Sequence, residues 1–431
     1  METHFSLDQL ADPDMRDSEK ILRACVHCGF CTATCPTYLL LGDELDSPRG
    51  RIYLLKDMLE NDKPASVDVV THIDRCLSCL SCMTTCPSDV NYMHLVDHGR
   101  HHIEKTYRRP FAERTLRRAL GIVLPRPRLF RLMLRIGVVL RRVGGVLPER
   151  LRHLLSFVPP DIPRSSGVER PRVIAAEGSP RKRVALLTGC VQQVLAPEIN
   201  RATIDLLTRH GCDVVIAAQA GCCGALNHHL GQDSLDRVKA NVDAWSAADA
   251  DGPLDAIIVN ASGCGTMIKD YGFLLRSDPA YAARARAVSA LARDVTELIS
   301  EIGLRAPVIS PGRRVAYQNP CSMQHGQKIV EQPAALLAQA GFALVPVADG
   351  HLCCGSAGSY NLLQPTLAAD LGARKAATLA TAAPDLVASG NIGCMVQLAP
   401  RLAVPIIHTV ELLDWATGGA VPQALVRGRR G

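Results

Sequence analysis

Short apolar runs alternate with amphipathic segments along the second half of the chain. The runs are shorter than buried helices and are bounded by turn residues, so they predict buried strands. They lie at residues 183–188, 213–218 and 256–260. Segments 199–210 and 234–247 place apolar residues at helical spacing, and Gly211 follows the first as a predicted C-terminal cap. This alternation predicts an α/β unit with parallel strands.

The same order of segments recurs further along the chain. A lone cysteine, a CCG triplet and a late cysteine mark each copy, and Gly341 takes the place of Gly211. The displacement is 131 residues for the first three cysteines and 130 for the last. The pairs are Cys190 and Cys321, Cys222 and Cys353, Cys223 and Cys354, and Cys264 and Cys394. A solenoid repeat is much shorter, so the period predicts two duplicated α/β domains, at residues 183–305 and 306–431.

The first 182 residues lack this alternation. Within residues 1–110, two cysteine-rich runs read as loops on either side of a helix-prone stretch near residues 51–59. This part is expected to be a small, mostly helical domain. Residues 111–182 are rich in arginine and leucine and predict a helical connector. The fold class expected for the chain is therefore α+β overall, with one helical domain followed by two α/β domains.

Composition adds an unusual number of cysteines to an otherwise ordinary soluble chain. Of 431 residues, 47% are hydrophobic and 21% are charged, but 17 are cysteine. An odd total argues against a closed disulfide framework. The N-terminus is polar and resembles no signal peptide, and no run of 18 apolar residues predicts a membrane span. We therefore expect thiols in a reducing compartment, used for metal or redox chemistry.

Eight of these cysteines form two identical motifs. Both runs read C-x2-C-x2-C-x3-C-P and are displaced by 51 residues. This is the run of bacterial two-cluster ferredoxins, in which the fourth cysteine ligates the other cluster. By that rule Cys25, Cys28, Cys31 and Cys86 hold one [4Fe–4S] cluster, and Cys76, Cys79, Cys82 and Cys35 hold the second. The helical domain is thus expected to be ferredoxin-like and to carry two clusters.

Zinc is the alternative metal. Zinc sites also use C-x2-C pairs, but normally as two pairs with a longer gap between them. Four cysteines within eleven residues, twice, each time followed by proline, favour iron and sulfide. A zinc-stabilised scaffold with no redox role remains the competing class of function, and it would be colourless.

The CCG repeats resemble the cysteine-rich domain of heterodisulfide reductases, anaerobic glycerol-3-phosphate dehydrogenases and lactate-utilisation proteins. That family ends in a C-x2-C pair, whereas here Met267 and Gln397 stand where the last cysteine is expected. Four cysteines for each repeat leave three roles open: ligands of an ordinary cluster, a redox or quinone-facing site, or buried thiols. Three histidines lie near the CCG triplets: His228, His229 and His351. We expect them to be packing residues rather than ligands, and we expect Cys212 to be a buried apolar thiol.

Over its whole length the chain resembles the iron–sulfur subunit of glycolate oxidase. The resemblance is carried by residues 21–56, 261–265, 351–360 and 391–394. It implies a component of a glycolate dehydrogenase complex that oxidises glycolate to glyoxylate, and D-lactate to pyruvate. It also implies FAD on partner subunits, an acceptor other than oxygen such as quinone, and a peripheral place on the cytoplasmic face of the bacterial inner membrane. The alternative is the equivalent subunit of a lactate or anaerobic glycerol-3-phosphate dehydrogenase.

The sequence agrees that the hydride chemistry belongs to another subunit, because it contains no G-x-G-x-x-G fingerprint and no phosphate loop. No catalytic residue is therefore expected in this chain. Partners are flavin-containing glycolate oxidase subunits.

Residues 100–183 concentrate positive charge. They contain 21 Lys and Arg against 6 Asp and Glu, so the remainder of the chain is net acidic. On a helix, Arg128, Arg131, Arg135 and Arg142 fall within a sector of about 60°, and Leu132, Met133, Ile136, Val139 and Leu140 lie on other faces. This favours packing against an acidic neighbour, with attraction to an anionic membrane as the alternative. Nucleic acid is not expected, because no aromatic residues interleave the arginines.

Overall fold

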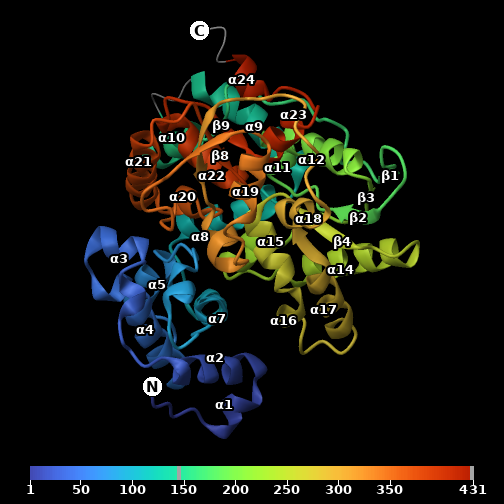
Figure 1. Ribbon diagram of the computed structural model, residues 1–431. Coiled ribbons are helices and arrows are strands. Elements are labelled where there is room, and N and C mark those ends of the chain that lie inside the picture. Colours follow the sequence, from blue (N-terminus) through green and yellow to red (C-terminus); the bar gives the residue numbers. More distant parts are fainter. Residues whose placement is uncertain (143–146, 428–431) are drawn as a thin grey trace.

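The computed structural model describes residues 1–142 and 147–427. A helical N-terminal region lies below two α/β units that pack side by side (Figure 1). The helices of this region are α1 (Leu7–Ala11), α2 (Pro13–Ala24), α3 (Pro36–Leu41), α4 (Pro48–Glu60), α5 (Val67–Asp74), α6 (Ser81–Thr85) and α7 (Tyr92–Thr106). The helix expected near residues 51–59 is α4, whose Ile52, Leu55 and Leu59 are buried in the core of this region.

Three connector helices follow: α8 (Phe111–Val123), α9 (Pro127–Leu140) and α10 (Glu149–Ser156). Helix α9 buries Phe130 and Leu134 against Leu155 of α10. Of the four arginines of the expected face, Arg128 and Arg135 on α9 and Arg142 just beyond it are exposed, whereas Arg131 is only partly exposed. Part of the basic connector also packs against acidic residues, since Arg117 contacts Asp74 at 2.6 Å.

The first α/β unit has a five-stranded sheet in the order β1-β3-β2-β4-β5. Its strands are β1 (Arg172–Ile174), β2 (Lys182–Leu186), β3 (Cys212–Ile216), β4 (Ala256–Val259) and β5 (Ala292–Asp294). Strands β2, β3 and β4 confirm the three predicted strands, and all pairs are parallel except β1 with β3. Between them lie α11 (Gln192–Leu195), α12 (Pro197–Arg209), α13 (Ala225–His229), α14 (Leu235–Ala250), α15 (Ser262–Lys269), α16 (Tyr271–Leu274), α17 (Ala282–Leu291) and α18 (Val295–Ile302).

The second unit repeats this topology with four parallel strands in the order β7-β6-β8-β9. They are β6 (Arg314–Gln318), β7 (Ala343–Val345), β8 (Leu386–Ser389) and β9 (Ile406–His408). A short π-helical turn, η4 (Ser322–Gly326), follows β6. The other helices are α19 (Gln332–Gln339), α20 (Tyr360–Leu363), α21 (Pro365–Thr381), α22 (Ile392–Leu398), α23 (Thr409–Ala416) and α24 (Gln423–Arg427). The α+β fold with two duplicated α/β units is thus confirmed.

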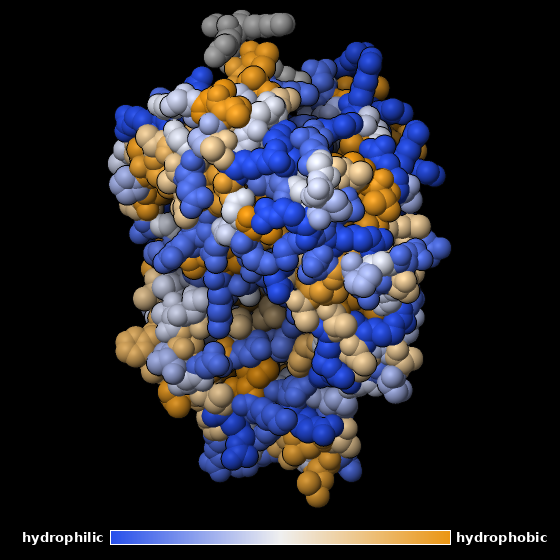
Figure 2. All heavy atoms as spheres, turned by 45° about the vertical axis from the view of Figure 1, so that its right-hand side comes forward, coloured by the Kyte–Doolittle hydropathy of each residue, from blue (hydrophilic) through white to orange (hydrophobic). Residues whose placement is uncertain are grey.

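The two units share one hydrophobic core. Buried residues of the first, such as Val184 and Leu206, and of the second, such as Val315 and Leu413, belong to the same contact group. Helix α12 packs on α23, where Arg209 contacts Asp414 at 2.8 Å. On the face shown in Figure 2, hydrophilic residues surround separate hydrophobic patches. Among the described residues, no helix combines the length and the apolar character needed to cross a bilayer.

Candidate iron–sulfur site

The two cysteine runs of the N-terminal region fold into nearly the same loop. In the first loop (residues 25–31) His27 and Gly29 have positive φ angles of 56° and 86°. In the second loop (residues 76–82) Ser78 and Leu80, at the same positions, have φ angles of 49° and 63°. Residues other than glycine adopt such positive φ angles only at an energetic cost, so the fold holds both turns in a strained form. In each loop these turns direct the three cysteines toward a common centre.

The fourth cysteine of each run lies outside its loop, in extended backbone. Cys35 has φ −81° and ψ 114°, and Cys86 has φ −76° and ψ 117°. Both precede a proline, which disfavours a helical conformation in the residue before it. Each fourth cysteine therefore follows a short helical turn, η1 (Phe30–Thr32) before Cys35 and α6 before Cys86, and ends that turn in extended backbone.

A pocket over the first loop collects sulfurs from both runs. Cys25, Cys28 and Cys31 line it together with Cys82 and Cys86 of the second run. The pKa of Cys25 is raised by burial, and the charges of Cys86 and Cys28 add to that effect, so Cys86 is a close neighbour. The structure thus brings Cys86 to the first three cysteines of the other run.

Cys35 lies correspondingly near the second loop. Burial raises the pKa of Cys79 well above its usual range, and the nearby thiols of Cys321, Cys35 and Cys76 raise it further. The pKa of Cys82 is raised in the same way by burial and then by Cys79, Cys76 and Cys35. Four crowded thiols resist ionisation unless a cation binds them, and the iron of a bound cluster would supply that charge.

The spacing of the sulfurs distinguishes a cluster from a single metal ion. Zn–S bonds of about 2.3 Å place the sulfurs of a tetrahedral site about 3.8 Å apart. Among the described residues, no three cysteine sulfurs lie within 4.8 Å of one another. The described cysteine sets are thus more open than a closed four-sulfur zinc site, and more open sets suit the ligands of a larger cluster.

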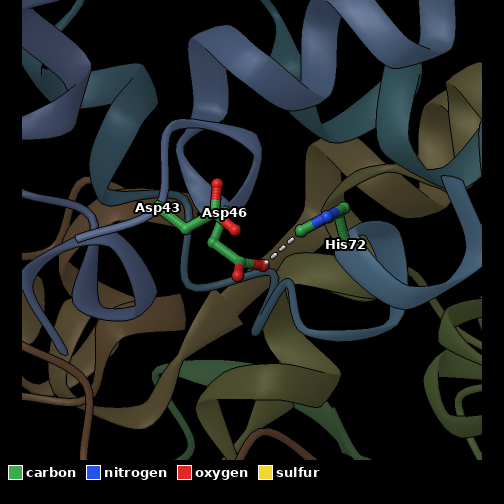
Figure 3. A group of neighbouring side chains, drawn as sticks. All are labelled: Asp43, Asp46 and His72. Atoms are coloured by element: carbon green, nitrogen blue, oxygen red, sulfur yellow. Dashed lines mark ion pairs between the residues drawn. The ribbon is translucent and has the colours of Figure 1, made fainter. Parts of the chain in front are cut away.

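The one compact group of ligand atoms in the described structure is Asp43, Asp46 and His72 (Figure 3). Asp46 is completely buried and contacts His72 Nδ1 at 3.0 Å. Its carboxylate also contacts Arg51 at 3.2 Å and Arg75 at 2.7 Å. Two guanidinium groups already neutralise this carboxylate, so the group serves as an anchor for Arg51 rather than as a cation site.

Arg51 connects this anchor to the cysteines. Its side chain is buried; Nε donates to the carbonyl of His72 at 2.7 Å, and Nη1 lies 3.8 Å from Cys35 Sγ. Burial opposes its charge, yet the surrounding groups, Cys76 first among them, raise the pKa of Arg51. A permanent positive charge therefore sits beside Cys35 and Cys76.

The structure also assembles both sets of CCG-repeat cysteines at the carboxyl ends of parallel strands. In the first quartet (Cys190, Cys222, Cys223 and Cys264) hydrogen bonds from Cys190 and Cys223 lower the pKa of Cys222 to about 3. In the second quartet (Cys321, Cys353, Cys354 and Cys394) Cys353 and Cys394 likewise hold the pKa of Cys354 well below its usual range. Each quartet is a connected chain of thiols with one stabilised thiolate.

The second quartet abuts the second loop, which the sequence did not reveal. Leu77, Cys353, Tyr360 and Leu371 form a buried group around which Cys79 and Cys321 pack. Turn η4, directly after Cys321, reaches helix α6 through a 2.8 Å hydrogen bond between His325 and Thr84. Local spacing along the chain carries no signal for this contact, because it joins residues far apart in sequence.

The histidines beside the CCG triplets have other partners. His228 Nε2 lies 3.3 Å and His229 Nδ1 3.5 Å from the carboxylate of Asp97 on α7. The carbonyl of His351 contacts His325 at 3.2 Å. Cys212 is fully buried on β3, as expected of an apolar thiol.

Two family profiles match the chain. The 4Fe-4S dicluster domain matches residues 21–90, and the cysteine-rich domain matches residues 184–269 and 315–399. A crystal structure of a hypothetical protein from Helicobacter pylori shares the fold, with a TM-score of 0.53 at 11% identity, over 96% of this chain and 74% of that chain. The two profile matches indicate iron–sulfur clusters, and the solved structure shows the fold alone.

Two of the relatives that match the chain cover nearly all of it, and a third covers about half. The glycolate oxidase iron-sulfur subunit of Escherichia coli (strain K12) is 43% identical over 96% of this chain and 99% of its own length. A probable glycolate oxidase iron-sulfur subunit of Bacillus subtilis (strain 168) is 32% identical over 94% and 96%. A lactate utilization protein A of Exiguobacterium is 26% identical over 54% of this chain and 96% of its own. The chain belongs to the family of glycolate oxidase iron–sulfur subunits.

Proposed function

We propose that this chain is the electron-transfer subunit of a complex that oxidises glycolate to glyoxylate, and D-lactate to pyruvate. The observation that carries the proposal is the 43% identity to a glycolate oxidase iron-sulfur subunit over 96% of the chain. The two like-folded cysteine loops support it, because they supply ligands for one-electron carriers. Flavin-containing partner subunits, with FAD, take the hydride, and the acceptor is a quinone or another acceptor other than oxygen.

Two [4Fe–4S] clusters, when bound, would accept and release single electrons. We assign Cys25, Cys28, Cys31 and Cys86 to one, and Cys76, Cys79, Cys82 and Cys35 to the other. The pocket that joins Cys86 to the first loop supports this crossed assignment. The quartets remain candidates for a further metal or redox site. We also propose domain limits at residues 1–110, 111–182, 183–305 and 306–431, which fall between the matched family profiles; the connector segment adds strand β1 to the sheet of the first α/β unit.

The experiment that tests the function is an anaerobic glycolate titration of the chain purified with its flavin subunits. We expect the clusters to be reduced stoichiometrically by glycolate, as followed by EPR, with eight irons per chain if the quartets are empty and more if they are filled. Near-zero acid-labile sulfide would refute the cluster assignment. Full reduction of the physiological acceptor by the flavin subunits alone would refute the relay role.

Crossed ligation has its own test. Cys86→Ser lies in the second run but is expected to abolish the signal of the cluster on the first loop. The matched variant Cys35→Ser should abolish the other. If each substitution instead removed the cluster of its own run, the crossed assignment would be wrong.

A peripheral membrane position, on the cytoplasmic face of the inner membrane, is supported by helix α9. Its apolar Leu132, Met133, Ile136 and Val139 are 51%, 43%, 43% and 61% exposed, beside the exposed arginines of the same helix. An exposed apolar stripe flanked by arginine is typical of helices that lie in an anionic interface. Co-sedimentation should be strong with phosphatidylglycerol vesicles and weak with phosphatidylcholine vesicles. Equal sedimentation with both, or with neither, would contradict it.

A further inference from the structure

The two cluster loops have the same backbone but opposite surroundings. Val26 and Leu77 occupy the same position, directly after the first cysteine of each run. Leu77 is 6% exposed, whereas Val26 is 66% exposed. Since the backbone turns the same way at both positions, the difference in exposure comes from what packs against each loop.

A protein surface covers the second loop. Leu77 lies in a buried group with Cys353, Tyr360 and Leu371, all from the second CCG repeat. An apolar residue beside a proposed ligand cysteine is therefore the contact by which this loop joins another cysteine-rich part of the chain. The second loop shows what the first would look like if it were occupied.

The first loop presents an apolar face to solvent. Phe30 is 63% exposed and Tyr53, from α4, is 62% exposed. The ring of His27 meets that of Tyr53 edge-on with 6.3 Å between centroids, which links the two sides of the face. Cys28, at its centre, is exposed, whereas the other sixteen cysteines are buried or partly buried. We call Val26, Cys28, Phe30 and Tyr53 the entry face.

Two arginines near the entry face are paired with carboxylates. Arg49 contacts Glu44 at 2.7 Å, and Arg23 contacts Glu19 at 3.4 Å. Paired arginines offer less attraction for anionic lipid than the exposed arginines of α9. Exposed aromatic and aliphatic side chains in one patch are instead typical of protein–protein contacts.

We propose that the entry face is the docking surface for the flavin-bearing subunit. The proposal rests on the proposed function, which requires a flavoprotein donor, and it places that donor against the one ligand cysteine that reaches the surface. Electrons then enter beside the first loop and leave beside the second, where the second quartet already covers Leu77. In this proposal the exposed first loop is where electrons enter the chain, and the second loop, covered by the second CCG repeat, is where they leave it.

The test is a double variant, Val26→Glu with Phe30→Glu, in the full chain co-expressed with its flavin subunits. We expect binding of the flavin subunits to weaken at least tenfold, with iron and sulfide per chain and reduction by dithionite unchanged. The matched control is Val308→Glu with Phe111→Glu, whose side chains are 69% and 74% exposed far along the sequence. It should bind the flavin subunits as the wild type does.

Three outcomes would overturn the proposal. The double variant could bind the flavin subunits like the wild type, the control could weaken binding equally, or the isolated chain could lose a self-association that the entry face had provided. If the double variant loses iron, Tyr53→Arg on α4 decides the matter, because it lies outside the cysteine loop. Should glycolate fail to reduce even the wild-type complex, the proposed function fails instead.

Discussion

Arg51 places a buried positive charge beside Cys35, a proposed cluster ligand. Its guanidinium contacts Cys35 Sγ at 3.8 Å and is held by Asp46, which is itself completely buried. Positive charge and hydrogen bonds near ligand sulfurs stabilise the reduced, more negative form of a cluster. Arg51 is therefore expected to raise the reduction potential of the cluster on the second loop.

Replacing Arg51 with methionine keeps the bulk of the side chain and removes the charge. We expect a lower midpoint potential for that one cluster in an EPR redox titration. Stability should also fall, by roughly 3–5 kcal/mol, because Asp46 loses a buried partner. Arg51→Lys should recover part of the potential. Arg284→Met, which breaks a surface pair with Asp243, should change neither quantity, and an equal effect there would contradict the assignment.

Sequence reasoning alone could not have found this residue. Arg51 stands in a stretch that was correctly predicted to be helical, but arginine on a helix is ordinarily solvated. Its role depends on Asp46, Thr37 and His72, which converge on it from three other segments. The spacing of cysteines along the sequence identified the candidate ligands. The side chains that surround them are brought together only by tertiary packing, which the sequence pattern does not reveal.

Helices and strands could be predicted best where a single local sequence signal determines the structure. Strands β2, β3 and β4 read as continuous apolar runs because parallel strands are covered on both faces. Gly211 and Gly341 have φ of 81° and 85°, as helix-ending glycines require. Strands β1 and β5 were not foreseen: each has only three residues, and β1 is largely exposed, so neither leaves an apolar run.

The CCG triplets offer a matched pair of glycines for a stability test. Gly224 and Gly355 have φ of 91° and 83°, which strains any other residue. A Cβ at Gly224 would lie 3.4 Å from its nearest neighbour, but at Gly355 it would lie 2.7 Å from the carbonyl oxygen of Ala368. Only the second contact forces the backbone to move.

We therefore expect Gly224→Ala to cost roughly 1–2 kcal/mol in the free energy of unfolding, from the positive φ alone. Gly355→Ala should cost at least twice as much. Gly358→Ala is the control, since its φ is 67° and no atom lies within 4 Å of the added Cβ. Denaturant unfolding of the three variants measures the difference, and equal losses would contradict the backbone clash.

Across the whole molecule, a buried ion pair joins the ferredoxin-type region to the first α/β unit. Asp97 of α7 faces His228 and His229 of α13, and Arg100 lies 3.5 Å away on its own helix. Burial opposes both charges, yet Asp97 raises the pKa of His228, and the two histidines hold the pKa of Asp97 well below its usual range. The contact is strongest when His228 is protonated and Asp97 is ionised.

The sign of the pH dependence follows from these shifts. The raised pKa of His228 contributes stability below its ordinary value of about 6.5, and this is lost as pH rises through the folded value. The lowered pKa of Asp97 contributes stability at pH values above about 3.9, and this stability is lost as the pH falls through the folded pKa. His228→Gln should therefore destabilise the protein more at pH 6 than at pH 9, as measured by unfolding at both values. Asp97→Asn should remove that difference, and a larger loss at pH 9 would refute it.

The two CCG repeats are alike in fold but not in position, which makes their cysteines unequal. Cys321 packs beside Cys79 of the second loop, and after burial it has the largest effect among the neighbouring thiols that raise the pKa of Cys79. The equivalent Cys190 instead lies in the first quartet, with Cys222 and Cys264 as its thiol neighbours. If electrons leave through the repeat that touches the second loop, only Cys321 lies on their path.

Cys321→Ser should accordingly slow oxidation of the reduced complex by a quinone at least tenfold, while its reduction by glycolate stays unchanged. Cys190→Ser, at the same place in the other repeat, should alter neither rate. Stopped-flow absorbance of the iron–sulfur bands measures both steps, and iron per chain checks that the eight ferredoxin-type cysteines remain loaded. Equal slowing of quinone-dependent oxidation by the two variants would contradict this path. It would show that the two duplicated cysteines matter equally, whatever their distance from the second loop, and that the contact between Cys321 and Cys79 is only structural.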